Sequence, residues 1–486
     1  MSSSTMKEGQ TASMKDIIAP LIAIIVGMFM VILDGTAMNV AIPRLMEDFE
    51  SSFSIVQWTI TGYALAQAAV IPLAGWLSDR FGAKQIFQLS IVLFTLGSAL
   101  CAFATTVDQL IIYRIIQGLG GGMVAPIAMA FTYRLSPPGK VGAVMGMIGI
   151  PMLLAPALGP VVAGWLVDSV SWHWIFIINL PIGVIGFIIG QRTLPNIARQ
   201  SVPSLDILGM LFAPVAFAAL AYGVSEGGND WGSAKTLTGL IVGGIALIVF
   251  IIVELRRREP LLELRVFRSS DFTRGIIVQW ISQIALFGTL FLIPVFLQQV
   301  KGYSALETGL ILLPQALAAA VCMPIGGKLY DRIGARPIVV GGMGLVIIAA
   351  FLFSQTTVNS ELIAYMIPLA LLGAGMGLSM MPLNTHIIQA APPELVSRVT
   401  SLTGAAQQVM TSFAIAGLST ILASRSEYYE GEGQSPADMI SSSYGDTFLV
   451  LTAIAVLGVL IGLLLRKPKV KADSAEKPEV SMMMGH

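Results

Sequence analysis

The segment GWLSDRFGAK at residues 75–84 recurs as GKLYDRIGAR at residues 327–336, so two short polar turns share one pattern. The matching positions are Gly75, Asp79, Arg80, Gly82 and Lys84 in the first copy and Gly327, Asp331, Arg332, Gly334 and Arg336 in the second. Turn chemistry and the excess of Lys and Arg in cytoplasmic loops would gather glycine and arginine in any such turn, but they do not explain the repeated order. Parallel repeats of this kind are typical of transporters whose two halves rock about a site near the bilayer midplane.

The composition indicates a membrane protein. Of the 486 residues, 55% are apolar and only 12% are Asp, Glu, Lys or Arg, and the mean hydropathy is +0.80. A water-soluble fold of this length cannot bury so much apolar surface, so we expect the bilayer to be the solvent. The two cysteines, Cys101 and Cys322, lie in apolar runs, which excludes a disulfide scaffold. The balance of 28 basic against 28 acidic residues argues against a nucleic-acid partner.

Fourteen apolar runs are long enough to span a bilayer, which takes roughly 20 residues. They begin near Ile17, Ser54, Ile86, Val107, Val141, Trp174, Ile207, Thr236, Gly275, Ala305, Pro337, Glu361, Ser401 and Phe448. If six spans belong to each copy of the repeat, the seventh and eighth form an inserted pair, which gives an all-α polytopic membrane protein with a 6+2+6 plan. The predicted segments are a cytoplasmic N-terminal segment (1–16), a six-helix bundle (17–195), an inserted helix pair (196–258), a second six-helix bundle (259–466) and a disordered cytoplasmic tail (467–486).

The distribution of charge predicts the orientation. With the N-terminus inside, 23 of the 28 Lys and Arg residues fall on the inner side and four fall outside. Acidic residues divide into 13 inside and 14 outside, so the inner face carries a net charge of +10 and the outer face −10. We therefore expect both termini in the cytoplasm, a basic inner loop at 256–274 and an acidic outer loop at 426–446.

Asp34 and Arg114 are the single acidic and the single basic residue predicted within a span. A charge at the bilayer centre costs about 2.5–3.5 kcal/mol on insertion scales, so such a group persists by pairing, by facing water or by taking up a proton. A carboxyl group that gains and loses a proton near neutral pH is what a proton-coupled carrier needs. The alternatives are an Asp34 that reaches the outer interface or caps a helix break at Gly35, and an Arg114 that makes a structural bond. Because each is the only residue of its charge predicted within a span, we expect Asp34 and Arg114 to be partners in one cavity.

The fifth span combines prolines with glycines, namely Gly149, Pro151, Pro156, Gly159, Pro160 and Gly164. Prolines bend a helix and glycines allow another helix to approach closely, so this span suits a hinge or a seal between halves. Other polar side chains within spans either line a substrate cavity or form interhelical hydrogen bonds. The cavity candidates are Asn39, Thr61, Gln67, Gln117, Gln283 and Asn384.

Catalytic motifs are missing from the sequence. There is no glycine-rich phosphate loop ending in Lys-Ser/Thr and no nucleophile elbow, and the three histidines, His173, His386 and His486, have no metal-ligand spacing. We therefore expect neither enzymatic activity nor a bound metal or cofactor.

Several of these motifs resemble those of the major facilitator superfamily, and specifically its fourteen-helix drug:H⁺ antiporter branch, the EmrB/QacA-like multidrug exporters. Residues 75–84 look like the inner-loop motif A, residues 113–118 like motif B, and residues 149–164 like the antiporter motif C. Residues 33–43 and 173–183 are similar to two further patterns of the branch. The resemblance covers nearly the whole chain and implies the major facilitator fold in a bacterial cytoplasmic membrane.

The resemblance also implies a function. Asp34 and Arg114 would couple proton movement to transport, and the Asp-Arg pairs of the two repeated turns would lock the inner face in the outward-facing state. The implied partners are a small-molecule substrate, protons and membrane lipid, with a membrane-fusion protein as a further partner in a double-membrane bacterium. Branch members that export dications carry extra acids where this chain has Thr61, Gln407 and Gln408. Neutral or singly charged amphiphilic drugs are therefore the expected substrates.

Two other functions stay open at the level of sequence. An exporter of one natural metabolite, such as an amino acid, peptide, siderophore or antibiotic, would use the same fold, and resistance to one compound rather than to several unrelated ones would indicate it. A non-transporting membrane sensor would usually add a soluble signalling domain, and the sequence shows no sign of one.

Overall fold

Long helices joined by short turns form the chain. The computed structural model describes residues 14–196, 207–227, 230–257 and 260–466, and these ranges contain no β-strand. Within them, fourteen helical spans are long and apolar enough to cross a bilayer. The predicted disordered tail and most of the predicted N-terminal segment lie outside the described residues.

The first half of the chain supplies six spans. They are α1 (Met14–Asp48), α3 (Trp58–Phe81), α4 (Ala83–Ala102), α5 (Val107–Leu135), α6 (Val141–Ser169) and the continuous pair α7 (Trp174–Ile177) and α8 (Asn179–Thr193), with a short helix α2 (Phe53–Val56) between the first two. In this bundle α5 packs against α3 and α4, and α1 packs against α6 and α8.

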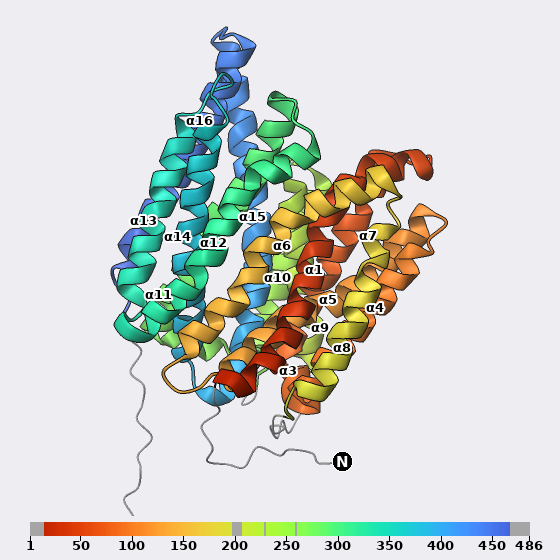
Figure 1. Ribbon diagram of the computed structural model, residues 1–486, viewed down its shortest axis with the longest axis vertical. Coiled ribbons are helices and arrows are strands. Elements are labelled where there is room, and N and C mark those ends of the chain that lie inside the picture. The colour runs from red at the N-terminus through yellow and green to blue at the C-terminus, as the bar shows by residue number, and fades with distance from the viewer. Residues whose placement is uncertain (1–13, 197–206, 228–229, 258–259, 467–486) are drawn as a thin grey trace, which may run out of the picture.

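The second half supplies six more spans. They are α11 (Ser270–Val295) with the π-helical turn η2 (Phe296–Val300), α12 (Ala305–Ile333), α13 (Ala335–Ser354), α14 (Ile363–Gln389), α15 (Val396–Gly431) and α16 (Pro436–Gly462), with a short turn η3 (Pro393–Leu395) before α15. The halves meet where α6 packs along α12 and where α3 and α5 pack against α15 (Figure 1).

The inserted pair lies on the seam between the halves. It consists of α9 (Ile207–Gly227) and α10 (Ala234–Arg256), followed by the 3-10 turn η1 (Leu264–Arg268). The two helices pack on each other, and α9 packs against both α3 and α15. Near the outer ends, the Tyr222 ring stacks on Trp58 of α3 at 6.1 Å, and the Trp231 indole N–H donates to Thr420 of α15 at 2.5 Å. The inserted pair therefore contacts both halves at once.

The expectation of an outer loop at 426–446 is wrong. Helix α15 continues to Gly431 and α16 begins at Pro436, so the acidic stretch forms a helical hairpin, which projects beyond the other helices in Figure 1. The polar side chains of this hairpin make contacts with one another that stabilise its two helices. Tyr428 donates to Glu432 one turn later, and Arg425 and Tyr429 both donate to Asp446 of α16.

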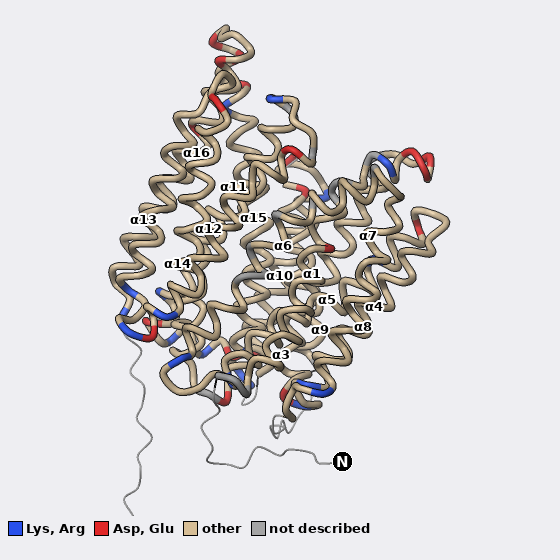
Figure 2. The backbone as a smooth tube through the Cα atoms, viewed as in Figure 1, with Lys and Arg blue, Asp and Glu red and all other residues tan. Residues whose placement is uncertain are grey.

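Charged residues are sorted between the two ends of the molecule. Figure 2 shows most Lys and Arg at the end where α1 begins, and acidic residues concentrated at the opposite end. The basic end therefore faces the cytoplasm. This agrees with the predicted orientation.

Candidate functional site

Asp34 and Arg114 form a buried ion pair inside the first half. Asp34 lies on α1 and Arg114 on α5, and the guanidinium Nη1 donates to Asp34 Oδ2 at 2.6 Å. Both side chains are fully buried. Asp34 therefore neither reaches the outer interface nor faces water in this structure. Breaking such a pair by removing one partner typically costs about 3–5 kcal/mol, because a buried charge is left without compensation.

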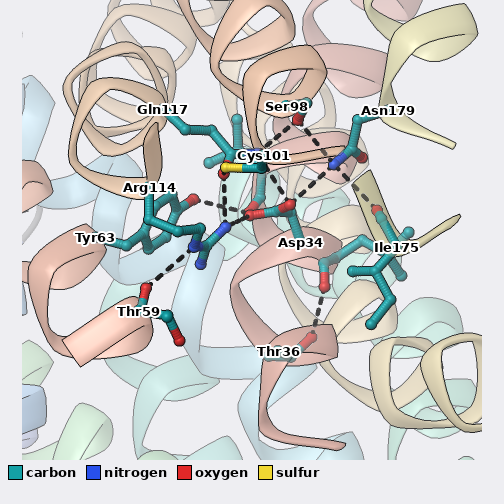
Figure 3. A network of polar contacts seen from close by, with 12 residues as sticks. Asp34, Thr36, Thr59, Tyr63, Ser98, Cys101, Arg114, Gln117, Ile175 and Asn179 are labelled. Carbon is teal, nitrogen blue, oxygen red and sulfur yellow. Dashed lines mark hydrogen bonds and ion pairs between the residues drawn. The ribbon is translucent and has the colours of Figure 1, made fainter. Parts of the chain in front are cut away.

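Amide groups complete the surroundings of the carboxylate (Figure 3). Gln117 Nε2 of α5 and Asn179 Nδ2 of α8 donate to Asp34 Oδ1 at 3.0 and 2.9 Å. Both amides also donate to the Ser98 hydroxyl of α4. Since every one of these donors favours the charged carboxylate, the arrangement is complementary to ionised Asp34.

Arg114 is anchored independently of Asp34. Its Nε donates to the Thr59 carbonyl of α3 at 3.1 Å, its Nη1 also donates to Gln117 Oε1 at 2.7 Å, and its guanidinium carbon lies 3.9 Å from the centre of the Tyr63 ring. Such a cation–π contact is worth more in a dry site than at an exposed one. The guanidinium therefore keeps partners even when the carboxylate changes its charge.

A cavity of about 10 Å³ adjoins Asp34 between α1, α6 and the α7–α8 pair. Its lining residues are Leu33, Asp34, Ala37, Val162, Ala163, Leu166, Ile175, Ile178 and Asn179. That volume is about the size that one water molecule needs. The cavity is therefore large enough to admit one water molecule next to the carboxylate.

Close packing connects this site to α6. A side chain at Gly159 of α6 would collide with Thr36, which lies two residues after Asp34 on α1. Farther along α6, Gly146 and Gly149 pack against Met323 of α12 in the other half. Helix α6 thus touches α1 near Asp34 and crosses to the second half near its inner end. Gly164 is buried, and the side chains of Pro151 and Pro160 lie outside the described residues.

The first repeated turn joins the two halves at the inner face. The buried Asp79 of α3 lies 3.6 Å from Arg134 of α5 and 3.7 Å from Arg398 of α15. Arg134 also donates to the Ser397 hydroxyl at 2.8 Å, and Gly75 packs so tightly on the Ser397 carbonyl that a Cβ would collide with it. The charge of Asp79 is therefore compensated from both halves.

The second repeated turn also joins the two halves at the inner face, through backbone N–H groups instead of arginines. Asp331 of α12 accepts hydrogen bonds from the N–H groups of Gly142 and Ala143 at 2.8 and 3.0 Å, so it caps the start of α6 in the opposite half. Gly327 packs against the Gly142 carbonyl. Together we call the contacts of Asp79 and Asp331 the inner gate.

The second glycine of each turn has a different task. Gly82 and Gly334 end α3 and α12 with φ of 99° and 84°, a conformation that side chains disfavour. Each glycine reverses the chain three residues after its gate aspartate. This explains why the repeat carries two glycines.

Other candidates are dispersed. Arg80 and Arg332 lie exposed at the inner ends of α3 and α12, and Lys84 donates to the Gln191 carbonyl within the first half. Gln117 belongs to the Asp34 network. Asn384 accepts from Gln279 of α11 at 2.6 Å.

The remaining cavity candidates do not converge. Gln283 is buried in α11 of the second half, whereas Thr61 and Gln67 are half-buried on α3 of the first. The side chain of Asn39 lies outside the described residues.

Sequence reasoning missed several participants. Ser98 gives no signal, because a serine in an apolar run is ordinary, and Asn179 stands out only as a member of the family pattern at 173–183. Arg134 and Arg398 sit beyond apolar runs at the inner face, where arginine is expected in any membrane protein. Among the described residues, no group of His, Cys, Asp and Glu could hold a metal ion.

Comparison with known proteins assigns the family. The family model of the Major Facilitator Superfamily matches residues 24–415. The chain is 31% identical over 471 residues to the lincomycin resistance protein LmrB of Listeria innocua, covering 96% of this chain and all of that protein. It is 37% identical over 397 residues to the multidrug resistance protein B homolog of Mycobacterium tuberculosis, covering 80% of this chain and 73% of that one.

Solved structures agree in fold. The human organic anion transporter MFSD10 superposes with a TM-score of 0.66 at 14% identity, over 91% of this chain and 99% of that one. The proton:xylose symporter XylE superposes with a TM-score of 0.64 at 14% identity, over 92% and 95% of the two chains. With fourteen spans among its described residues, two related halves and this family match, the chain belongs to the Major Facilitator Superfamily and is a multi-pass membrane transporter of the cell membrane.

Proposed function

We propose that this protein exports amphiphilic drugs or similar toxic small molecules across the cytoplasmic membrane in exchange for protons, acting as a carrier rather than an enzyme. The observation that carries the proposal is the buried Asp34–Arg114 pair. The relatives of this chain that are named for lincomycin and multidrug resistance support it. In a double-membrane bacterium a membrane-fusion protein would extend the export path.

Proton exchange at Asp34 supplies the driving step. A proton that arrives from outside neutralises the carboxylate and removes its attraction for Arg114, which retains Gln117, the Thr59 carbonyl and the Tyr63 ring. Release of that proton to the cytoplasm restores the pair. One charge moving through 100 mV supplies about 2.3 kcal/mol, so one proton supports a modest concentration ratio.

Helix α6 provides a route from this step to the inner gate. Gly142, at the gate, and Gly159, beside Thr36, are separated by 17 residues, or about 26 Å of helix. When Asp34 loses its charge, α1 shifts against α6, and the contact between α6 and Asp331 opens. The inner gate then exposes the substrate path to the cytoplasm.

Substrate and proton occupy different places in this scheme. Asp34 is enclosed by Arg114, Gln117 and Asn179, so a drug does not need to touch the carboxylate. Because the described spans of the second half bury no Asp or Glu side chain that could bind a second positive charge, the scheme favours neutral or singly charged amphiphiles. A carrier of this kind accepts unrelated compounds.

The test is dye accumulation by inverted vesicles with an imposed acid interior. Wild type should accumulate a cationic dye uphill, and Asp34→Asn should lose nearly all uphill accumulation. Asp108→Asn, which removes an exposed acid at the outer end of α5, is the matched control and should accumulate normally. Normal uphill pumping by Asp34→Asn would refute the proton role, and competition by only one of several unrelated drugs would indicate a dedicated metabolite carrier instead.

A further inference from the structure

A second cavity, of about 300 Å³, lies between the inserted pair and the second half and shares no residue with the Asp34 site. Its lining residues are Phe217, Leu247, Phe250, Ile251, Leu255, Leu264, Phe267 and Leu402. All eight are apolar, and the volume is at the lower end of roughly 300–1,000 Å³ for ligand pockets. The cavity therefore suits a hydrocarbon chain.

The cavity lies at the depth of the inner leaflet. Helix α10 runs toward the cytoplasm and ends at Arg256, and four lining residues occupy its last three turns. Leu255 is 51% exposed and Ile251 is 36% exposed on the outside of the bundle. The mouth of the cavity thus faces lipid rather than the space between the halves.

Two exposed arginines directly follow lining residues at the inner end of this cavity. Arg256 directly follows the lining residue Leu255, Arg268 directly follows Phe267, and both arginines are exposed. Arg265 is already engaged, because it donates to the Leu255 and Arg257 carbonyls.

The nearby acids do not cancel this charge at the rim. Glu254 and Glu263 are buried and accept N–H groups of Leu262 and Arg265. Arg256 and Arg268 are therefore available to an anionic group at the interface. Basic pockets between helices on the cytoplasmic side are suited to anionic lipid head groups.

We propose that this cavity is a binding site for an anionic phospholipid, with an acyl chain among Phe250, Leu247 and Leu402 and the phosphate held by Arg256 and Arg268. Both ends of such a molecule match what the site presents, whereas in a zwitterionic lipid such as phosphatidylcholine the head-group cation offsets the phosphate. The site shares no residue with the cavity beside Asp34.

Its position links lipid binding to the inner gate. Arg398 lies one turn before the lining residue Leu402 on α15. Its Nη1 donates to the Pro260 carbonyl at 3.1 Å, in the segment between α10 and η1, while its Nε faces Asp79 at 3.7 Å. A bound lipid that holds Pro260 in place also holds Arg398 at Asp79, and therefore stabilises the closed gate.

Retention of lipid by the full-length protein tests the site. Delipidated protein is offered equimolar phosphatidylglycerol and phosphatidylcholine, and the retained lipid is identified by native mass spectrometry. Wild type should prefer phosphatidylglycerol about 30-fold, since the two arginines contribute about 1 kcal/mol each near a membrane surface, and Arg256→Gln/Arg268→Gln should reduce the preference to about twofold or less. The control, Lys140→Gln/Arg466→Gln, removes two exposed inner charges elsewhere and should keep the preference.

Other results of the lipid-retention experiment would overturn the proposal. No preference in wild type, or the same loss in both double variants, overturns the proposal. Leu247→Trp, which obstructs the cavity with a larger side chain and leaves both arginines, should abolish the tightly retained lipid, and unchanged retention in this variant also overturns the proposal. A drug displacing phosphatidylglycerol competitively would show a substrate entry site instead.

The link to the gate has its own readout. Spin labels on Phe81→Cys at the end of α3 and Glu394→Cys before α15 report the distance across the inner face. Phosphatidylglycerol should increase the short-distance population in wild type and leave it unchanged in Arg256→Gln/Arg268→Gln. An equal response in both proteins contradicts the link.

Discussion

Asp34 receives donors from α5 and α8 while remaining fully buried, and this combination sets its energetics. Asp34 and Arg114 are 80 residues apart in the sequence. Helices α1 and α5 must therefore come together before either charge is compensated. The pair therefore contributes to the assembly of the first half as well as to its chemistry.

A double-mutant cycle should show this interdependence. Arg114→Met leaves Asp34 buried without its counter-charge and should lower the free energy of unfolding by about 3–5 kcal/mol. Asp34→Asn/Arg114→Met removes both charges and should be more stable than Arg114→Met alone, as measured by thermal unfolding in detergent. Additive losses in the two single variants would show that the groups do not interact.

Asn179 offers a comparison between a charged and a neutral hydrogen bond. Asn179→Ala removes a donor from the charged Asp34 and should cost about 1.5–3 kcal/mol, whereas Asn384→Ala removes a neutral contact with Gln279 and should cost about 0.5–1.5 kcal/mol. Chemical denaturation of both variants measures the difference. The reverse order would mean that Asp34 is uncharged in the folded protein.

At the scale of helices, the repeated turns work through backbone contact between halves. Gly75 meets the Ser397 carbonyl and Gly327 meets the Gly142 carbonyl, so the inner ends of α3 and α12 approach α15 and α6 without intervening side chains. An added methyl group at either position keeps the halves apart.

Alanine substitutions should therefore have opposite effects at different glycines. Gly75→Ala and Gly327→Ala should reduce export at least about tenfold, because the closed gate becomes inaccessible. Gly344→Ala, in open space on α13, should retain export and gain up to about 1 kcal/mol from helix propensity. Vesicle transport and thermal unfolding distinguish these cases, and normal export by Gly75→Ala would contradict the packing argument.

Much of this organisation was predictable, for physical reasons. Span number and orientation follow from apolar length and charge, which are local properties of the chain, and the isolation of Asp34 and Arg114 made their pairing a reasonable hypothesis. The roles of Ser98 and Arg398 depend on contacts between distant helices, which no local pattern encodes. The outer hairpin was missed because hydropathy detects the membrane boundary, while helix formation continues past it through contacts such as Tyr428 with Glu432.

For the whole molecule, the inner gate is the contact that must open and close in every cycle. Asp79 lies between Arg134 of the first half and Arg398 of the second, so its charge offsets the repulsion between two arginines. The gate therefore depends on electrostatics as well as on packing.

Loss of the gate charge should slow the cycle more than it weakens binding. Asp79→Asn leaves Arg134 and Arg398 mutually repelling and favours an open inner face, so turnover should fall about tenfold or more while the dissociation constant for drug changes less than about threefold. Transport rates and equilibrium dye binding measure the two quantities. Unchanged turnover with weakened binding would assign Asp79 to substrate recognition instead.

The inserted pair touches one half through the ring of Tyr222 on Trp58 and the other through the indole of Trp231 on Thr420. Alternating access changes the relation between those halves, so the surroundings of at least one of these two indoles must change with it. Trp58 and Trp231 are thus intrinsic fluorophores at the contacts between the inserted pair and the two halves. Variants that keep only one of these two tryptophans let fluorescence emission follow the conformational cycle without any attached dye.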